Sequence, residues 1–171
     1  ITLKSGTTGS TGTIHSNKST TPEWNKIQHL ISSRKKMKAK VILSYGKDNT
    51  GNLYHLQNIL HFRDLIISQG GKVDLVTGDG GLDYSTNFNF QEQMSFQLIF
   101  CEIVSAFSIL KNGGNFVLKI FDIYTTVTLQ FLFLLSNYFE TVIISKPYTS
   151  RPANSEKYVV CKNFNGISDV C

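Results

Sequence analysis

The sequence carries its clearest chemical signal at Lys119, which stands in the run FVLKIF with apolar residues on both sides. An ammonium group taken out of water must find a partner or give up its proton, so a lysine in such surroundings is a candidate general base. The alternative is a lysine at an exposed strand end whose aliphatic stem covers apolar surface. The first interpretation requires other acid–base groups near Lys119.

Two carboxylates stand in comparable places. Asp79 follows the β-branched run VDLVTG and precedes two glycines, which permit a ligand to approach the backbone closely. Glu156 lies in a polar loop shortly before the strand-like run YVVC. Taken alone, Asp79 could be only a turn former. A lysine and two carboxylates projecting from one edge of a sheet predict general acid–base chemistry.

The elements that would place these residues follow a regular β-α order. Strand-like runs alternate with longer helical segments over residues 41–45, 55–68, 73–78, 91–110, 115–121, 124–138 and 141–145. This alternation predicts a mainly parallel, doubly wound sheet covered on both faces, with its ligand crevice beyond the carboxyl ends of the strands. Gly70-Gly71 and Gly113-Gly114 each precede a strand, where a left-handed helix cap is favoured.

The last strand departs from this order. Only a short loop, residues 147–155, separates the run at 141–145 from the one at 157–162, and no crossover helix fits between them. The two strands should therefore pair antiparallel. A terminal antiparallel strand after the last helix is typical of class I methyltransferases rather than of dehydrogenases. We therefore expect an α/β, Rossmann-like fold of that class.

Composition bounds the class of protein. The chain has 171 residues, 41% of them hydrophobic, and its apolar stretches are interrupted before they reach membrane-spanning length. The net charge of +5 favours a polyanionic partner such as nucleic acid, although a solvated basic surface would give the same charge. Cys101, Cys161 and Cys171 are odd in number and lack metal-ligand spacing, which indicates reduced thiols in an intracellular protein.

Three parts are expected along the chain: residues 1–40, a core over 41–163 and a tail over 164–171. Residues 5–21 are dominated by Ser, Thr and Gly, which predicts a flexible loop. Thr21 and Pro22 then resemble a helix start, and a basic run at 34–40 follows that helix. The chain begins at Ile1 with no methionine and no signal peptide, so a fragment is one interpretation.

Three motifs together resemble one family. GDGGLD (78–83), GGNFVLKIFD (113–122) and KPYTSRPANSEKYVVCK (146–162), in this order, resemble the FtsJ-like 2'-O-ribose methyltransferases. The resemblance covers residues 40–163 and is strongest to the eukaryotic-type mRNA cap-specific branch, which methylates the first transcribed nucleotide. The SRPANSE block is far more specific for that branch than the DGG or the lysine-bearing strand.

The resemblance implies that Asp79, Lys119 and Glu156 are the last three members of the family's Lys-Asp-Lys-Glu tetrad. Lys119 would take the proton of the ribose 2'-hydroxyl, and the two carboxylates would orient it. The implied cofactor is S-adenosyl-L-methionine, the implied partner is capped mRNA, and no metal is implied. The implied location is the nucleus, or the cytoplasm for a viral protein.

The same resemblance implies contacts outside the tetrad. Asn52 and Leu53 match a cofactor-contacting position, where Asn52 replaces the family's usual aspartate and brings no charge; otherwise it is a turn residue. Contacts to the capped RNA would come from Asn89, Phe90, Gln91 and Asn154.

The start of the chain departs from the family. Residues 1–4 resemble the segment that follows the family's glycine-rich cofactor loop, but that loop, its strand and the first tetrad lysine are absent from the sequence. An N-terminal segment or another chain would then supply the loop. The alternatives are a non-catalytic RNA-binding or scaffold remnant of the same fold, and a related enzyme that methylates another RNA position.

Overall fold

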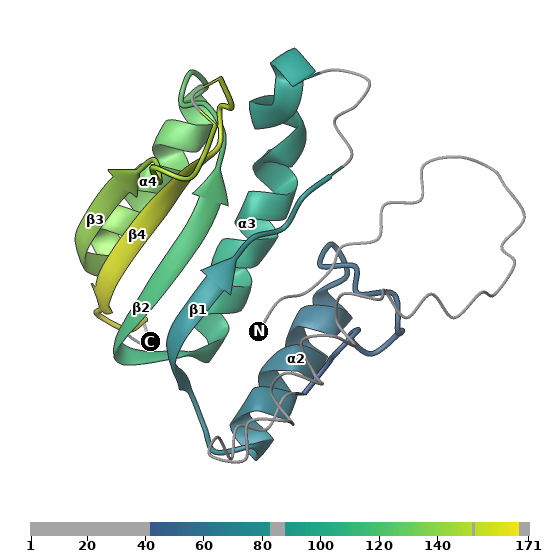
Figure 1. Ribbon diagram of the computed structural model, residues 1–171. Helices are drawn as coiled ribbons and strands as arrows, with labels where there is room; N and C mark the ends of the chain where they lie inside the picture. The colour runs from purple at the N-terminus through teal and green to yellow at the C-terminus, as the bar shows by residue number, and fades with distance from the viewer. Residues whose placement is uncertain (1–41, 83–87, 152, 168–171) are drawn as a thin grey trace, which may run out of the picture. The chain divides into compact units, whose positions relative to one another are not determined.

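The computed structural model describes residues 42–82, 88–151 and 153–167 (Figure 1). The chain divides into two compact units, one of Ile1–Thr7 with Ser44–Cys171 and the other of Thr8–Leu43. The predicted loop at 5–21, the helix that follows it, the basic run at 34–40 and Cys171 all lie outside the described residues. Nearly all of the described residues therefore belong to the first unit.

The described strands form one four-stranded sheet in the order β1-β2-β4-β3 (Figure 1). β1 (Val73–Gly78) pairs parallel with β2 (Leu110–Ile120), whereas β4 (Lys157–Phe164) pairs antiparallel with both β2 and β3 (Phe139–Ser145). The predicted class, with mostly parallel strands and one antiparallel strand, is confirmed. The antiparallel strand is last in sequence but lies between β2 and β3, not at the edge of the sheet.

The helices begin and end close to their predicted positions. They are α2 (Leu56–Ser68), α3 (Gln91–Ile109), which follows the short 3-10 turn η1 (Phe88–Phe90), and α4 (Thr126–Tyr138). α3 and α4 lie behind the sheet in Figure 1 and share one hydrophobic core with β2, β3 and β4. Within the described residues, none of the helices combines the length and apolarity that a membrane span needs.

Strand alternation in β2 decides which residues enter this core. Phe116 and Leu118 are fully buried against the helices, and burial of one such side chain contributes about 1.5–3 kcal/mol. Val117 and Lys119 point to the other face, because successive side chains of a strand alternate. Leu118 and Lys119 are neighbours in the chain but lie on opposite faces of the sheet. Leu118 therefore enters the core, while Lys119 stays on the face that carries the candidate catalytic residues.

The second face of the sheet was predicted to be covered as well. α2 also packs on the helix side, because Phe62 and Ile66 of α2 form a cluster with Ile109 of α3. On the opposite face, Leu75 is 56% exposed and Ile143 is 44% exposed. No described helix covers that face.

The predicted strand at 41–45 is wrong for the residues that can be judged. Residues 42–45 form no strand, and Leu43 and Tyr45 are exposed. A strand needs a hydrogen-bonded neighbour, and no described strand lies beside this run. It leads instead into a loop that the hydrogen bond from Gly51 N to Tyr45 O closes.

The two glycine pairs differ in their roles. Gly70, with φ of +138°, follows the end of α2 and donates to Ile67 O, as predicted for a helix cap. Gly113 also has positive φ, +78°, but α3 has already ended and Leu110 is extended. Gly113 lies instead in an irregular stretch of β2, where the pairing with β1 shifts register.

Candidate active site

The structure brings Lys119 and Asp79 together at the carboxyl ends of β1 and β2. Lys119 Nζ lies 2.9 Å from Asp79 Oδ1 and donates a second hydrogen bond of 3.3 Å to the Asp79 backbone oxygen. Strand register causes this meeting, because Gly78 is the partner of Leu118 and the next residue on each strand is Asp79 or Lys119. The Lys119 side chain is 14% exposed and that of Asp79 is 57% exposed. The lysine is thus largely desolvated, and its partner opens to solvent.

Glu156 approaches this pair through Tyr158, a residue that the sequence reasoning missed. Tyr158 lies directly opposite Lys119 in the antiparallel β2–β4 pair, and its hydroxyl donates to Glu156 Oε1 at 3.1 Å. Glu156 makes no direct ion pair with Lys119 within the described part of the chain. The missed signal was the spacing of two residues between Glu156 and Tyr158, which puts both on one face of an extended chain.

The pKa of the Tyr158 phenol is raised by its surroundings. Burial, the Asp79 carboxylate and the Glu156 carboxylate together raise the pKa of Tyr158 to about 12. Tyr158 therefore stays protonated at neutral pH and remains a hydrogen-bond donor.

Glu156→Gln is expected to lower the pKa of Tyr158 from about 12 toward 10, the ordinary value for tyrosine. The substitution removes a negative charge beside the phenol, while burial and Asp79 keep part of the shift. Carbon-13 NMR of labelled tyrosine rings across an alkaline titration measures this pKa. Glu140→Gln, at an exposed position on β3, is the matched control and should change nothing. An unchanged Tyr158 pKa in Glu156→Gln would show that the two side chains do not interact.

Two lysines hold the loop that carries Glu156. At its start, Lys146 Nζ donates to the backbone oxygens of Asn154 and Glu156 and to Ser150 Oγ. At its end, Lys157 Nζ donates to the backbone oxygen of Ser155 at 3.0 Å and pairs with the Asp122 carboxylate at 3.2 Å. Backbone carbonyls that lack strand partners are thereby satisfied. Lysine hydrogen bonds therefore hold both ends of the polar loop ahead of β4.

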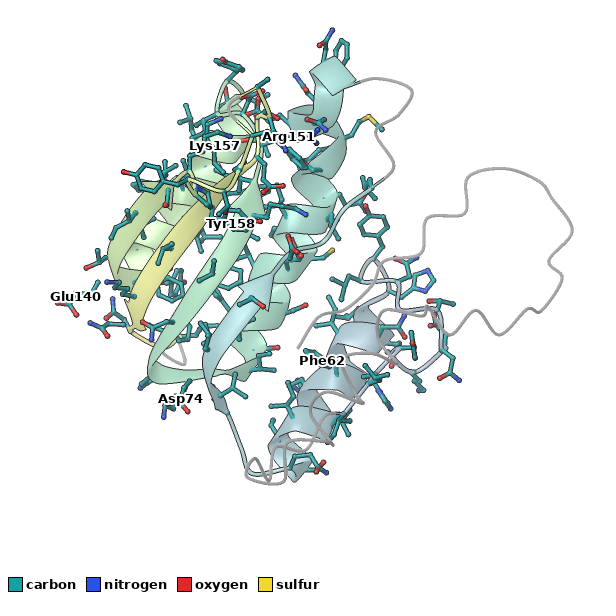
Figure 2. The ribbon with its side chains drawn as sticks, in the orientation of Figure 1. Phe62, Asp74, Glu140, Arg151, Lys157 and Tyr158 are labelled. Carbon is teal, nitrogen blue, oxygen red and sulfur yellow. The ribbon has the colours of Figure 1, made fainter. Side chains whose placement is uncertain are left out.

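The same loop is tied to the start of α3. Asn154 Oδ1 accepts from Glu156 N at 3.0 Å, and Ser155 Oγ donates to Gln91 Oε1 at 3.0 Å. Figure 2 shows Arg151 and Lys157 at one end of the sheet, with Asp74 and Glu140 at the opposite end. The loop and the Lys119–Asp79 pair thus lie toward the same end of the molecule.

A polar pocket of about 740 Å³ lies between this loop and α3. Three of the four residues predicted to contact substrate line it, namely Asn89, Gln91 and Asn154. Phe90 does not line this pocket and is 51% exposed. The remaining lining includes Arg151, Asp122 and Tyr124, the last of which is 86% exposed. Amides, a guanidinium and an exposed aromatic ring can bind phosphates and stack on bases.

The structure places the predicted cofactor contacts in a loop with internal bonding. Asn52 Oδ1 accepts from Tyr54 N at 2.9 Å, and the Asn52 carbonyl accepts from the amide of the buried Asn58. Leu53 is 4% exposed and packs in a cluster with Ile59 and Leu98. Asn52 is thus bonded as a turn residue, and Leu53 is packed as a core residue. Their role toward a cofactor stays a prediction.

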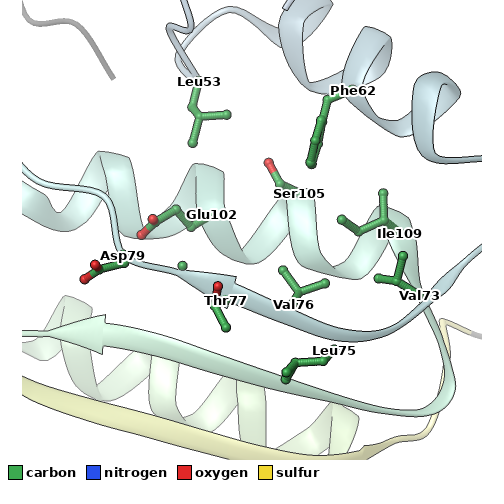
Figure 3. A pocket seen from close by; sticks show the side chains of 11 residues that line it. Leu53, Phe62, Val73, Leu75, Val76, Thr77, Asp79, Glu102, Ser105 and Ile109 are labelled. Carbon is green, nitrogen blue, oxygen red and sulfur yellow. The ribbon is translucent and has the colours of Figure 1, made fainter. Parts of the chain in front are cut away.

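A second missed residue is Glu102 of α3, which is 8% exposed. Its Oε1 accepts a 2.7 Å hydrogen bond from Gly80 N, in the turn that carries Asp79. Figure 3 shows Glu102 reaching from α3 toward the end of β1. The available signal was a single carboxylate inside the apolar run LIFCEIV (98–104).

Comparison with known proteins shows which family this chain resembles. Residues 20–164 match the FtsJ-like methyltransferase family. Cap-specific mRNA (nucleoside-2'-O-)-methyltransferase 1 of Dictyostelium discoideum is 42% identical over 125 residues, which are 72% of this chain and 16% of that protein. The Homo sapiens protein of the same name is 41% identical over 128 residues, 73% of this chain and 15% of that protein. Cap-specific mRNA (nucleoside-2'-O-)-methyltransferase 2 of Drosophila melanogaster is 42% identical over 122 residues, 71% of this chain and 17% of that protein.

The chain thus spans about a sixth of the length of the curated relatives it matches. Among solved structures, a Plasmodium falciparum protein described as a ribosomal RNA methyltransferase matches with a TM-score of 0.51 and 23% identity. The match covers 74% of this chain and 64% of that one. This likeness supports the fold.

Proposed function

This chain belongs to the FtsJ-like methyltransferase family, and from that premise we propose that it methylates the ribose 2'-hydroxyl of the first transcribed nucleotide of capped mRNA. The observation that carries the proposal is the ion pair between Lys119 and Asp79 at the carboxyl ends of β1 and β2. By the same family resemblance, we propose a nuclear location.

Lys119 is the proposed base. Its neutral amine would accept the proton of the 2'-hydroxyl as the O–H bond breaks. The oxygen would then bond to the methyl carbon as the bond from that carbon to the cofactor's sulfur breaks and leaves its electron pair on the sulfur. Asp79 orients the amine through the 2.9 Å contact, and Tyr158 with Glu156 closes the other side of the site. The protein therefore contributes mainly by positioning reactants and by removing one proton.

The family's cofactor is S-adenosylmethionine, which when bound supplies an electrophilic methyl group on a positively charged sulfur. The described residues fit that charged end, because Asp79 presents a carboxylate that is 57% exposed beside the site. Asn52 and Leu53 are the other proposed contacts to the cofactor, although Asn52 Oδ1 already accepts a hydrogen bond within its own loop.

The remaining cofactor contacts are proposed to come from residues outside the described part of the chain. β1 pairs with β2 on one edge, and no described strand pairs with its other edge. A cavity of about 40 Å³ lies along β1 between α2 and α3, lined by apolar residues that include Phe62, Val76 and Ile109 (Figure 3). A further parallel strand with a glycine-rich turn, from an N-terminal segment or another chain, would fit at this edge.

The polar pocket between the loop and α3 is the proposed site for capped RNA. Arg151 can pair with a phosphate, and Tyr124 offers an exposed ring for stacking. Asn89, Gln91 and Asn154 supply amides that can donate or accept hydrogen bonds. The net charge of +5 favours the same partner.

Methyl transfer to matched RNAs tests this proposal. The chain, with any N-terminal sequence that its gene encodes, is incubated with radiolabelled S-adenosylmethionine and one RNA sequence in capped and uncapped forms. We expect label on the capped RNA alone, and nuclease mapping should place it on the first transcribed nucleotide.

The outcomes of this assay separate the alternatives. Label on the second nucleotide would favour the alternative of a related enzyme that methylates another RNA position. Binding of capped RNA without any label would support the scaffold alternative. Equal label on capped and uncapped RNA would contradict cap specificity.

A further inference from the structure

Glu102 is a buried carboxylate that the proposed chemistry does not use. It lies in the middle of α3 and is 8% exposed. Within the described residues, its carboxylate accepts one hydrogen bond, the 2.7 Å bond from Gly80 N to Oε1. Burial raises its pKa to about 7, an effect that the Gly80 hydrogen bond and the Lys119 charge oppose and that Asp79 reinforces. Keeping a carboxylate here therefore costs folding free energy near neutral pH.

The hydrogen bond to Gly80 reaches the catalytic lysine through one peptide group. The N–H of Gly80 and the C=O of Asp79 belong to the same peptide plane. Glu102 accepts from the N–H at 2.7 Å, and Lys119 Nζ donates to the C=O at 3.3 Å. A carboxylate that accepts the N–H polarises the peptide and makes its oxygen a better acceptor. Glu102 and Lys119 thus hold opposite ends of one small dipole.

The Glu102 carboxylate lies close to two glycines of the turn, Gly78 and Gly80. A Cβ on Gly80 would lie 2.7 Å from Glu102 Oε1 and 2.9 Å from Leu98 Cδ2. A Cβ on Gly78 would lie 3.2 Å from the Glu102 carboxyl. A side chain at Gly80 would therefore displace the carboxylate or Leu98, and one at Gly78 would crowd the carboxylate.

The ionisable groups around Glu102 come from every element that packs against it. Asp79 and Lys119 lie above the turn, and Tyr54 precedes α2. Cys101 is its neighbour on α3. Of these, Lys119 alone attracts the ionised carboxylate. The charge of Glu102 is therefore linked to the proposed catalytic base.

We propose that Glu102 is a positioning residue, whose ionised carboxylate fixes the Asp79–Gly80 peptide and through it the amine of Lys119. The inference rests on the proposed function for its effect on catalysis, but the positioning of Lys119 can be measured without it. Protonation of Glu102 would weaken the hydrogen bond from Gly80 N. The position of the Lys119 amine would therefore depend on pH near neutrality.

Glu102→Gln tests the charge with little change in shape. We expect kcat to fall about tenfold, the difference between a charged and a neutral acceptor, with KM for capped RNA and cofactor within about twofold. The wild-type pH–rate profile should carry an inflection near pH 7 that the variant lacks. An unchanged kcat, or a slowed variant that keeps the inflection, would overturn the proposal.

Two further measurements do not depend on methyl transfer. The rate of trace acetylation of Lys119, plotted against pH, should change slope near pH 7 in the wild type and not in Glu102→Gln. The reason is that the hydrogen bonding of the Lys119 amine depends on the charge of Glu102. If the wild type transfers no methyl group, the proposed function fails and this labelling still tests the positioning. Identical labelling profiles in the two proteins would refute it.

Thermal unfolding separates positioning from a purely structural role. Because the folded pKa of Glu102 is raised, the wild type should lose stability as pH rises from about 4.5 through about 7. Glu102→Gln should match the wild type at pH 4 and have the higher Tm at pH 8. A variant that is both slower and less stable at pH 8 would indicate a structural role instead. Glu140→Gln, exposed on β3, is the control for all three measurements.

Discussion

Lys119→Arg is expected to abolish methyl transfer to capped RNA, with a loss of about 10²–10⁴-fold, the range that general base catalysis contributes. Arginine keeps the positive charge and the aliphatic stem, but a guanidinium is not deprotonated in proteins and cannot accept the hydroxyl proton. Its planar guanidinium would also have to replace the Lys119 amino group, whose Nζ lies 2.9 Å from Asp79 Oδ1. Radiolabelled transfer on capped RNA measures the loss.

RNA affinity should stay within about twofold of wild type in Lys119→Arg, because the charge that attracts phosphates is unchanged. A binding assay at fixed salt on the same samples checks this. Lys162→Arg is the matched control, since Lys162 is exposed on β4 and has no contact with Asp79 among the described residues. Robust turnover by Lys119→Arg would remove Lys119 from the mechanism. A scaffold protein would show no transfer from either sample.

Glu92→Ala is expected to lower the free energy of unfolding by about 1–3 kcal/mol, because it leaves several partly buried donors without their acceptor. Glu92 lies in the first turn of α3 and is 6% exposed. Its carboxylate accepts from the backbone N–H groups of Tyr124 and Thr125 and from the hydroxyls of Thr125 and Thr128. These are the donors at the start of α4, so a side chain of one helix caps the next.

Urea unfolding monitored by circular dichroism measures this change. Burial alone would raise the pKa of Glu92, but its hydrogen bonds to Thr125, Thr128 and Tyr124 outweigh burial and lower it. The stabilisation should therefore be present above the unfolded-state pKa, about 4.5 for glutamate, and be lost as pH falls through the lower folded value. Glu140→Ala, which removes one exposed hydrogen bond from Asn163 Nδ2, should change stability by less than about 1 kcal/mol. An equally small change in Glu92→Ala would show that the cap is dispensable.

Local pattern in the sequence was sufficient for most elements. The run VDLVTG predicted β1 at 73–78 with the bounds that the structure shows, and the apolar periodicity of 91–110 predicted α3 to within one residue. These signals are local, because strand and helix periods are written in neighbouring residues. The antiparallel pairing of β3 and β4 also followed from a local fact, the short loop between them.

The site could be predicted only where its residues mark strand ends. Asp79 and Lys119 each follow or interrupt an apolar run, and the parallel register of β1 and β2 brings them together as expected. Tyr158 and Glu102 gave weaker signals, because an aromatic residue in a strand and a lone carboxylate in a helix are each common. Their partners, Glu156 and Gly80, identify them only once the chain is folded.

The sequence by itself determined the order of the elements from residue 55 onward and the lysine and carboxylates that the family motif contains. The tertiary structure alone decided that residues 42–45 form no strand, that β4 lies between β2 and β3, and that Glu102 and Lys119 share one peptide group. The physical reason is that a strand exists only beside a partner, and that contacts between residues far apart in the chain depend on register and packing. Neither is encoded in the periodicity of a single segment.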